Sequence, residues 1–439
     1  MAQIRKRKNS YQFIVCNGED SNGKRIEHTM TYHPDPSLTP KQQEKAVKKA
    51  AMDFEEKVKK GTCLDGDKIT FSEFYEKWYE DYALIELEKT TLAGYDHNIR
   101  TKVIPVLGNM KLSMIKPIHL TSLYNSLRKD GVRQDNKTTG YSATTINMIH
   151  VTISSILRKA VEWDVLLYNP CDRVKTPKRA KDSDDIQYFT IEQTQCFLNA
   201  LDMTYDQPVK GRKRKDSTGK EYNVAPYINK VTIPLQFKVL FYIAIYGGLR
   251  RGEIVSLQWS DVDFEKNTIS ISKSTAYVAG ESYIKGTKTK SSNRTIVFPP
   301  TVMKLLKQYK TEYYQNQLQL GSQWATDDNG KRLDFLFTQW NGKQMNISTP
   351  RQRFHSIINQ YNATVTKEED KLPMIHFHDL RHTSATLLIS QGVDIATVAG
   401  RLGHSQKSTT LDIYTHSLKE MDISASEKLE NVLLNKKFS

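Results

Sequence analysis

Residues 247–253 have the sequence Gly-Gly-Leu-Arg-Arg-Gly-Glu and directly follow Phe237–Tyr246, a mostly apolar run. The run predicts a buried helix, and the paired glycines are typical of a helix end. A second helix is expected to begin at Arg250. The stretch therefore places a permanently charged guanidinium at a turn between two helices, one of which lies in the core.

Three other short segments also place a cation or a proton donor beside a turn. No one of them would be decisive alone, because arginines beside glycines often cap helix ends and single histidines are often structural. Their order and spacing make the set informative. They are GTKTK at 286–290, HDLRH at 378–382, and LGHS at 402–405, with Tyr414 ten residues after His404.

The surroundings of two of these segments indicate where their side chains lie. Lys288 falls between candidate strands at 283–285 and 294–298, so we expect it at the tip of a hairpin. His378 and Arg381 are three residues apart in a helical pattern. They therefore share one face of that helix.

The composition is that of a folded, basic protein. The 439 residues include 64 Lys and Arg against 49 Asp and Glu, a formal net charge of +15. Such a surplus attracts polyanions, so nucleic acid and anionic membrane are the two partners to weigh. The longest apolar stretch, Val231–Leu249, is interrupted by polar residues, and the first ten residues lack an apolar signal core. We therefore expect a cytoplasmic protein that binds nucleic acid and neither spans a membrane nor is secreted.

Five pieces of the chain resemble the motifs of the tyrosine recombinase (phage integrase) family: GLRRGE, KTK, HDLRH, LGH and IYTH, in this order across roughly 186–420. The resemblance implies a three-domain integrase of the phage or conjugative-transposon type, which integrates and excises a mobile element. It also implies double-stranded DNA attachment sites of the core and arm types as substrate, a homotetramer on DNA, and an excisionase or other directionality factor as partner. No cofactor and no metal are expected.

We expect a multi-domain fold. Residues 1–62 combine two β-rich runs with an amphipathic helix and predict a small α+β domain, a three-stranded sheet plus a helix. Residues 66–172 predict an all-α module, and the charged stretch 173–185 predicts a linker. Residues 186–439 predict a mixed, mainly-α domain with a small antiparallel sheet, in which the basic segment 206–229 is interpreted as a solvated loop. By resemblance, the three folded parts are arm-binding, core-binding and catalytic domains.

The resemblance assigns six residues to catalysis: Arg250, Lys288, His378, Arg381, His404 and Tyr414. A DNA phosphodiester resists nucleophilic attack, so cleavage without a metal needs fixed cations on the non-bridging oxygens and an acid for the departing oxygen. The arginines supply planar forks that match phosphate, the lysine is the expected general acid, and the histidines donate hydrogen bonds or shuttle protons. The tyrosine is the expected nucleophile, which forms a covalent 3′-phosphotyrosine and so conserves the bond energy.

Two carboxylates lie within the same motifs. Glu253 and Asp379 are close in sequence to the arginines of their motifs. We expect orienting salt bridges to those arginines rather than proton transfer.

A second group of cations is expected to contact DNA from the N-terminal domain. The cluster at residues 5–8 would contact phosphates, while the strands would supply contacts to the bases. The residues are Arg5, Lys6, Arg7 and Lys8, followed by Lys24 and Arg25.

Three other functions compete with a mobile-element integrase. A non-catalytic DNA-binding regulator would be expected to lack one of the catalytic residues, all of which are present. A type IB topoisomerase-like activity shares the chemistry but gives no reason for a separate N-terminal sheet. A chromosome-dimer-resolving recombinase usually has two domains, so residues 1–62 favour the integrase.

Overall fold

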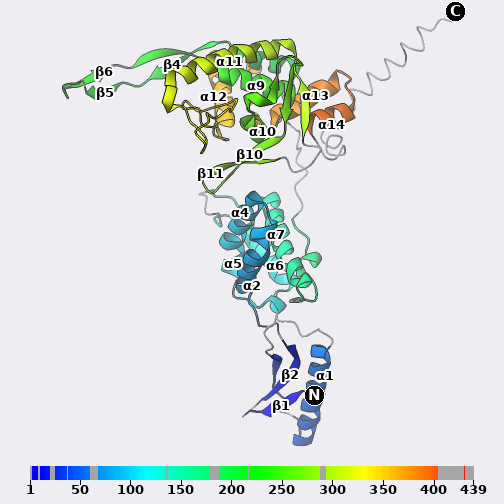
Figure 1. The fold of residues 1–439 in the computed structure, drawn as a ribbon. Helices are drawn as coiled ribbons and strands as arrows, with labels where there is room; N and C mark the ends of the chain where they lie inside the picture. The colour runs from blue at the N-terminus through cyan, green and yellow to red at the C-terminus, as the bar shows by residue number, and fades with distance from the viewer. Residues whose placement is uncertain are drawn as a thin grey trace, which may run out of the picture. The chain divides into compact units, whose positions relative to one another are not determined.

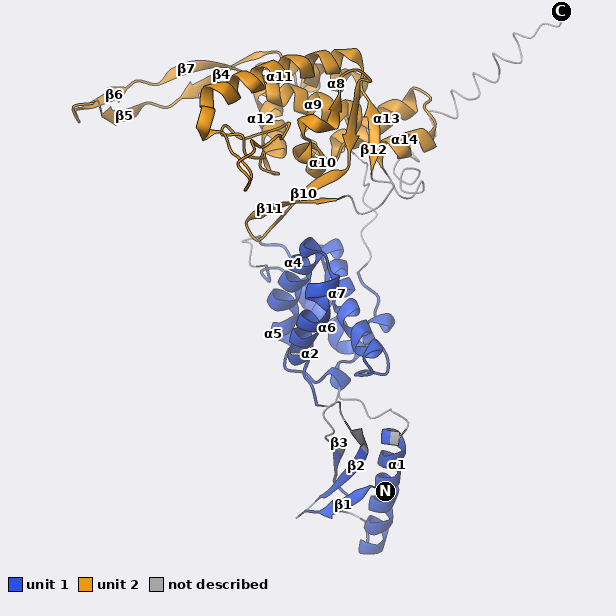
Figure 2. Ribbon diagram, viewed as in Figure 1, with its two compact units in different colours: residues 1–182 blue, residues 183–439 orange. Residues whose placement is uncertain are grey.

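The computed structural model describes residues 2–7, 10–19, 25–36, 38–59, 68–133, 137–177, 187–215, 217–286, 293–403 and Glu430. The chain forms two compact units, residues 1–182 and 183–439 (Figure 2). Their boundary falls inside the expected linker 173–185, whereas the finer division of the first unit stays a prediction. Within the described ranges, no helix has both the length and the apolar character needed to cross a membrane.

The N-terminal residues form the expected three-stranded antiparallel sheet with one helix (Figure 1). Its strands are paired in the order β1-β2-β3, with Ile4 opposite Phe13 and Phe13 opposite Met30. The apolar stripe of the helix packs on the central strand, where Phe54 lies against Phe13. The elements are β1 (Gln3–Lys6), β2 (Tyr11–Glu19), β3 (Arg25–Tyr32) and α1 (Pro40–Lys59).

The rest of the first unit is helical and has a separate core. The first helix of this part begins at a capping box, in which Thr70 and Glu73 satisfy each other's backbone N–H groups. Two π-helical turns, Tyr79–Ala83 and Ile99–Val103, interrupt the helical run. The α-helices are α2 (Phe71–Trp78), α3 (Leu84–Glu86), α4 (Lys89–Asn98), α5 (Ile104–Leu107), α6 (Pro117–Leu127) and α7 (Ala143–Glu162).

The second unit is built around one buried helix, α9 (Leu235–Gly247), whose side chains are apolar on nearly every face. Helices α10, α11, α12 and α13 all contact it. This arrangement confirms the buried helix expected at Phe237–Tyr246. The other helices are α8 (Ile191–Ala200), α10 (Arg251–Ser256), α11 (Pro300–Leu320), α12 (Thr349–Thr364), α13 (Asp379–Ser390) and α14 (Ile395–Leu402).

Two small antiparallel sheets lie beside these helices (Figure 1). One has the order β12-β9-β8, from β8 (Val262–Asp263), β9 (Thr268–Ile271) and β12 (Arg294–Val297). The other is a hairpin of β10 (Lys273–Val278) and β11 (Glu281–Gly286), closed by a turn at Ala279 and Gly280, which both have positive φ.

The prediction that Lys288 lies at the tip of a hairpin is wrong. Strand β11 pairs with β10, and β12 pairs with β9, so the segment that carries Lys288 connects two sheets. The sequence signal identified the strands on either side of the segment. It could not show which strands pair, because pairing is decided by contacts between residues distant in sequence.

The basic segment 206–229 also differs from its prediction as a solvated loop. It forms a two-stranded antiparallel ribbon that projects from the body of the second unit (Figure 1). At the root β4 (Thr204–Val209) pairs with β7 (Tyr227–Thr232), and farther out β5 (Arg212–Lys215) pairs with β6 (Glu221–Val224). Four consecutive basic residues have low intrinsic strand propensity, so no strand was expected there.

Candidate active site

The turn between α9 and α10 positions Arg250. Helix α9 ends at Gly248, which has a φ of 60° in the left-handed region. A Cβ at this glycine would lie 2.5 Å from Cδ2 of Leu402, so only glycine fits without moving the Leu402 side chain. Arg250 then precedes α10, and its backbone N–H donates to Glu253 Oε2 at 2.9 Å. The tight turn thus brings the arginine close to the end of α14.

Glu253 is the centre of a buried ion-pair network. Its side chain is 3% exposed, and its carboxylate accepts from Arg250 Nη1 at 2.9 Å and from Arg294 Nη2 at 2.8 Å. A second bond, from Arg294 Nη1 at 3.2 Å, makes that pair bidentate. Burial alone would raise the pKa of Glu253, but the hydrogen bonds and charges of Arg294 and Arg250 outweigh it and lower the pKa. The orienting ion pair expected between Glu253 and Arg250 is thus present.

Arg294 is a functional candidate that the sequence did not reveal. Besides Glu253, it donates from Nε to the carbonyl oxygen of Arg401 at 2.8 Å. Gly403, with a φ of 69°, turns the chain beside it, and Arg250 Nη2 lies 3.4 Å from the Gly403 carbonyl oxygen. Arg294 therefore joins the carboxylate that holds Arg250 to the end of α14. The only sequence feature that could have pointed to Arg294 was its position as a charged residue at the start of an expected strand.

The start of α13 supplies a second arginine. Arg381 is 3% exposed, and its Nη1 donates to the carbonyl oxygen of Gly248 at 2.8 Å. This bond satisfies a carbonyl at the end of α9, next to the turn that carries Arg250. The two arginine motifs, 131 residues apart in sequence, are thus tied through one hydrogen bond to the backbone.

His378 precedes α13 and lies against His382, with ring centroids 5.4 Å apart. Desolvation, together with the charges of His382 and Arg381, lowers the pKa of His378 to about 4. The ring is therefore neutral at pH 7 in the free protein. A neutral imidazole can donate a hydrogen bond from one nitrogen and accept one at the other.

Asp379 has a backbone partner in the structure. Its Oδ2 accepts from the backbone N–H of His376 at 2.7 Å. This bond fixes the chain just before α13 begins. The salt bridge from Asp379 to an arginine stays a prediction.

A cavity of about 520 Å³ lies beside these residues. It combines four Lys or Arg residues with two histidines, and none of the described residues that line it is Asp or Glu. Arg381 is not in this lining, whereas Arg250 and His378 are. The cationic and histidine residues are Arg250, Arg251, Lys285, Arg351, His376 and His378. Such a site favours an anion, and phosphate is one of the anions whose geometry guanidinium groups match.

Comparison with known proteins identifies the family. Residues 222–421 match the Phage integrase family, and residues 70–128 match the family described as Phage integrase, N-terminal SAM-like domain. The chain belongs to the phage integrase, or tyrosine recombinase, family. This confirms the resemblance drawn from the five motifs.

Relatives and solved structures of this family extend over most of the chain. A "Tyrosine recombinase XerC-like" protein of Caldanaerobacter subterraneus subsp. tengcongensis is 26% identical over 446 residues, covering 98% of each chain. The ICEBs1 integrase of Bacillus subtilis is 28% identical and covers 67% of each. A structure of the Tn1549 transposon integrase with transposon right-end DNA has a TM-score of 0.61 at 21% identity, covering 82% of this chain and 99% of that one. The structural likeness shows a shared fold.

The remaining residues singled out in the sequence are not all described. Lys288, His404 and Tyr414, like Lys8 and Lys24, lie outside the described residues. In the N-terminal sheet the cations of the first cluster that are described are exposed, and Arg25 begins β3, while their DNA-binding role stays a prediction. The exposed cations are Arg5, Lys6 and Arg7.

The Glu253→Gln variant of this recombinase is expected to lose about 3 kcal/mol of stability, because it leaves the buried guanidinium group of Arg294 and the partly exposed one of Arg250 without their counter-charge. Urea unfolding at pH 7 measures the loss. Glu281→Gln, which changes an exposed carboxylate on β11, is the matched control and should unfold like the wild type. Equal midpoints for all three proteins would show that the network contributes nothing to stability.

The lowered pKa of His378 predicts a pH dependence of stability. Between pH 6.5 and about 4 the unfolded chain takes up a proton on this ring that the folded chain does not, so the free energy of unfolding falls as the pH is lowered through that window. Urea unfolding from pH 4 to 8 should show a shallower pH dependence for His378→Gln than for the wild type. Parallel curves would contradict the assignment of a low pKa.

Proposed function

We propose that this chain cleaves and rejoins DNA at the cationic cavity beside Arg250. One observation carries the proposal: the cavity gathers arginine, lysine and histidine from α10, β11, α12 and the residues just before α13, and no acidic residue is among the described residues of its lining. Buried Glu253 lies behind Arg250 and accepts one hydrogen bond from its guanidinium and one from its backbone N–H. A fixed cation of this kind stabilises charge that develops on a phosphate during attack. The family to which the chain belongs is one of site-specific DNA recombinases.

The proposed reaction needs no external energy source. The hydroxyl oxygen of Tyr414 attacks the scissile phosphorus, an O–P bond forms to the 3′ phosphate, and the bond to the 5′ oxygen breaks. Lys288 donates a proton to that leaving oxygen. A 5′ hydroxyl of the partner strand then attacks the phosphotyrosine and releases the tyrosine. The number of phosphoester bonds is unchanged.

Two described residues, Gly286 and Gly403, come shortly before Lys288 and His404 in the sequence. Lys285 lines the cavity, and Gly286, two residues before Lys288 in sequence, ends β11. Gly403, whose carbonyl oxygen lies 3.4 Å from Arg250 Nη2, directly precedes His404. These positions support catalytic roles for Lys288 and His404.

We favour integration and excision of a mobile element over chromosome-dimer resolution. Residues 3–59 form a sheet and helix with their own hydrophobic cluster, in addition to the helical module and the second unit. A separate module of this kind can bind a second class of DNA site. Two-domain recombinases that resolve chromosome dimers have no counterpart to it.

Strand exchange by this chemistry involves four strands and therefore four active sites. We propose a homotetramer on paired core sites, with an excisionase or another directionality factor to select excision. The helical pattern with Ala425, Leu429, Val432 and Leu433 is the segment proposed to dock on the next subunit. These four residues lie outside the described residues, so the docking role rests on the sequence pattern alone.

A chain that lacks residues 1–62 is expected to lose binding to arm-type DNA while its binding to core-type DNA stays within a few-fold of the full chain. The physical reason is that the N-terminal sheet has its own core, so removing it leaves the hydrophobic clusters of the helical module and of the second unit intact. Footprinting on the DNA that flanks the gene measures both sites. Loss of core binding together with retained arm binding would contradict the proposal.

The function itself is tested with duplex DNA from the circular junction of the element, nicked close to the exchange point so that the cleaved strand diffuses away. The wild-type protein should form an adduct with this DNA that survives denaturation and is removed by protease. A protein that binds the junction but forms no adduct would be a DNA-binding regulator.

A further inference from the structure

The ribbon formed by β4, β5, β6 and β7 has no role in the proposed chemistry. Its outgoing side runs from Thr204 to Lys215, twelve residues of which ten are in β4 and β5, so it reaches at most about 40 Å from its root. The region matched by the family begins at residue 222, so β4 and β5 lie before it. The ribbon thus adds a long arm to the second unit.

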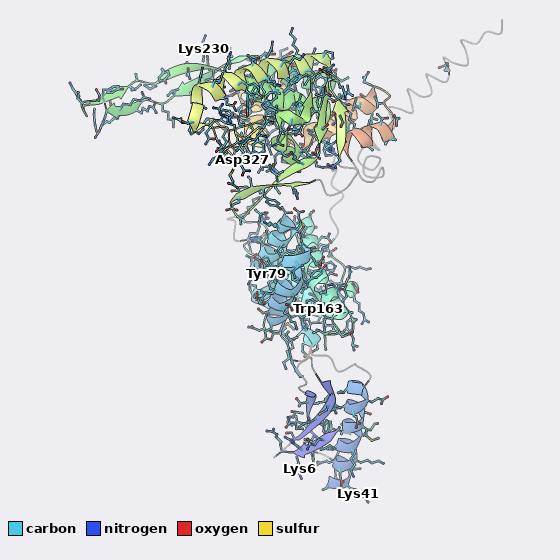
Figure 3. All side chains as sticks on the ribbon, viewed as in Figure 1. Lys6, Lys41, Tyr79, Trp163, Lys230 and Asp327 are labelled. Atoms are coloured by element: carbon cyan, nitrogen blue, oxygen red, sulfur yellow. The ribbon has the colours of Figure 1, made fainter. Side chains whose placement is uncertain are left out.

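Nearly the whole ribbon is exposed to solvent on both faces (Figure 3). Tyr205 at the root is buried, and its hydroxyl donates to the carbonyl oxygen of Ala200 at 2.5 Å, which anchors the arm to the end of α8. Beyond the root, an isolated two-stranded ribbon gains little stability of its own in water. A binding partner that covers one face would supply the missing contacts.

The charges of the ribbon identify the class of partner. Residues 204–232 contain seven Lys or Arg against three Asp or Glu. In β5 all four residues are cationic and exposed. The partner is therefore anionic, and its binding should weaken as salt is added.

The register divides these cations between two faces. Arg214 lies opposite Tyr222 and Arg212 lies opposite Val224, so these four side chains share one face. The other face pairs Lys215 with Glu221, with an N–O distance of 3.6 Å. The first face combines two guanidinium forks with an exposed aromatic ring, and none of its four paired residues in β5 and β6 is acidic.

We propose that the ribbon is a second DNA-binding arm, which lies in a groove of the duplex with the Arg212, Arg214 and Tyr222 face against the DNA. The major groove of B-DNA admits a two-stranded ribbon, and arginines bind phosphates or guanine edges there. A length of about 40 Å corresponds to about 12 base pairs of duplex. The arm therefore extends the contact of the second unit along the DNA.

The test compares two double variants with the same change of charge. Arg212→Gln with Arg214→Gln removes the proposed contact face, and Lys213→Gln with Lys215→Gln removes the opposite one. All four side chains are exposed, so both variants should fold like the wild type, which thermal unfolding checks. Binding is measured by fluorescence anisotropy on a short core duplex and on the same duplex lengthened by about 12 base pairs on each side.

We expect the arginine variant to lose at least about tenfold in affinity for the longer duplex, because two charge-assisted bonds are lost. The slope of log affinity against log salt should fall by about 2. The lysine variant should lose much less, and the short duplex should bind all three proteins alike. This assay needs no strand cleavage, so its failure leaves the catalytic proposal untouched.

Three results would overturn the inference. Equal losses in both variants would show that the ribbon contributes charge without a specific face. Unchanged affinity and salt slope in the arginine variant would show that the ribbon does not touch DNA. Unchanged DNA binding with lost recombination would assign the face to an acidic protein surface.

Discussion

The Tyr414→Phe variant is expected to lose covalent attachment to DNA completely while it keeps nearly all of its DNA affinity. The change removes one hydroxyl oxygen, which is the proposed nucleophile, and leaves the ring and every cation of the cavity in place. Because phenylalanine has no atom that can attack phosphorus, no slower version of the same step remains. Denaturing gels with nicked junction DNA measure the adduct, and gel shifts measure the affinity.

A matched control separates this effect from the loss of any tyrosine hydroxyl. Tyr277 lies on β10, and its side chain is 50% exposed. Tyr277→Phe should form the adduct at the wild-type rate. A protease-sensitive adduct formed by the Tyr414→Phe protein would place the nucleophile at another residue.

Local patterns predicted the elements around the site. The apolar run before Gly247 gave the buried helix α9, and the glycine at position 248 takes the left-handed conformation that ends it. Glu253 lies three residues after Arg250, so their ion pair is made within one helical turn and can be expected from sequence. Such features depend on neighbours in the chain.

Features that depend on distant residues were missed. Arg294 is 41 residues from Glu253, and nothing local distinguishes it from a solvated arginine at a strand end. Because β11 pairs with β10 and not with β12, the Lys288 segment connects two sheets and does not close the hairpin that the sequence predicted. In both cases the deciding contacts form only when separate parts of the second unit pack together.

The ribbon illustrates a different difficulty. Its strands lack the apolar alternation that predicts a strand with one buried face, because neither face is covered beyond the root. High charge and a turn-rich sequence are typical of loops as well. The antiparallel register of β5 and β6 could therefore be seen only in the structure.

Replacement of Arg250 or of Arg381 by lysine is expected to slow DNA cleavage by at least about 10²-fold, which is the scale of losing one donor that acts on the transition state. Lysine keeps the charge but not the planar fork, so it cannot bind two phosphate oxygens side by side. In Arg250→Lys the ion pair with Glu253 can persist while the geometry towards the cavity is lost. Single-turnover cleavage of nicked DNA measures the rates, with Arg332→Lys, at an exposed position, as control.

The two variants should differ in stability. Arg381 donates to the Gly248 carbonyl oxygen from a buried position, so Arg381→Lys should also cost about 1–3 kcal/mol through the weakened cap. Arg250 is partly exposed, and its replacement should affect stability less. If Arg381→Lys unfolds at lower urea but cleaves at the wild-type rate, Arg381 serves only to hold the end of α9. If it cleaves slowly under conditions in which it is fully folded, Arg381 acts on the phosphate as well, and the buried guanidinium links the Arg250 turn to the reaction.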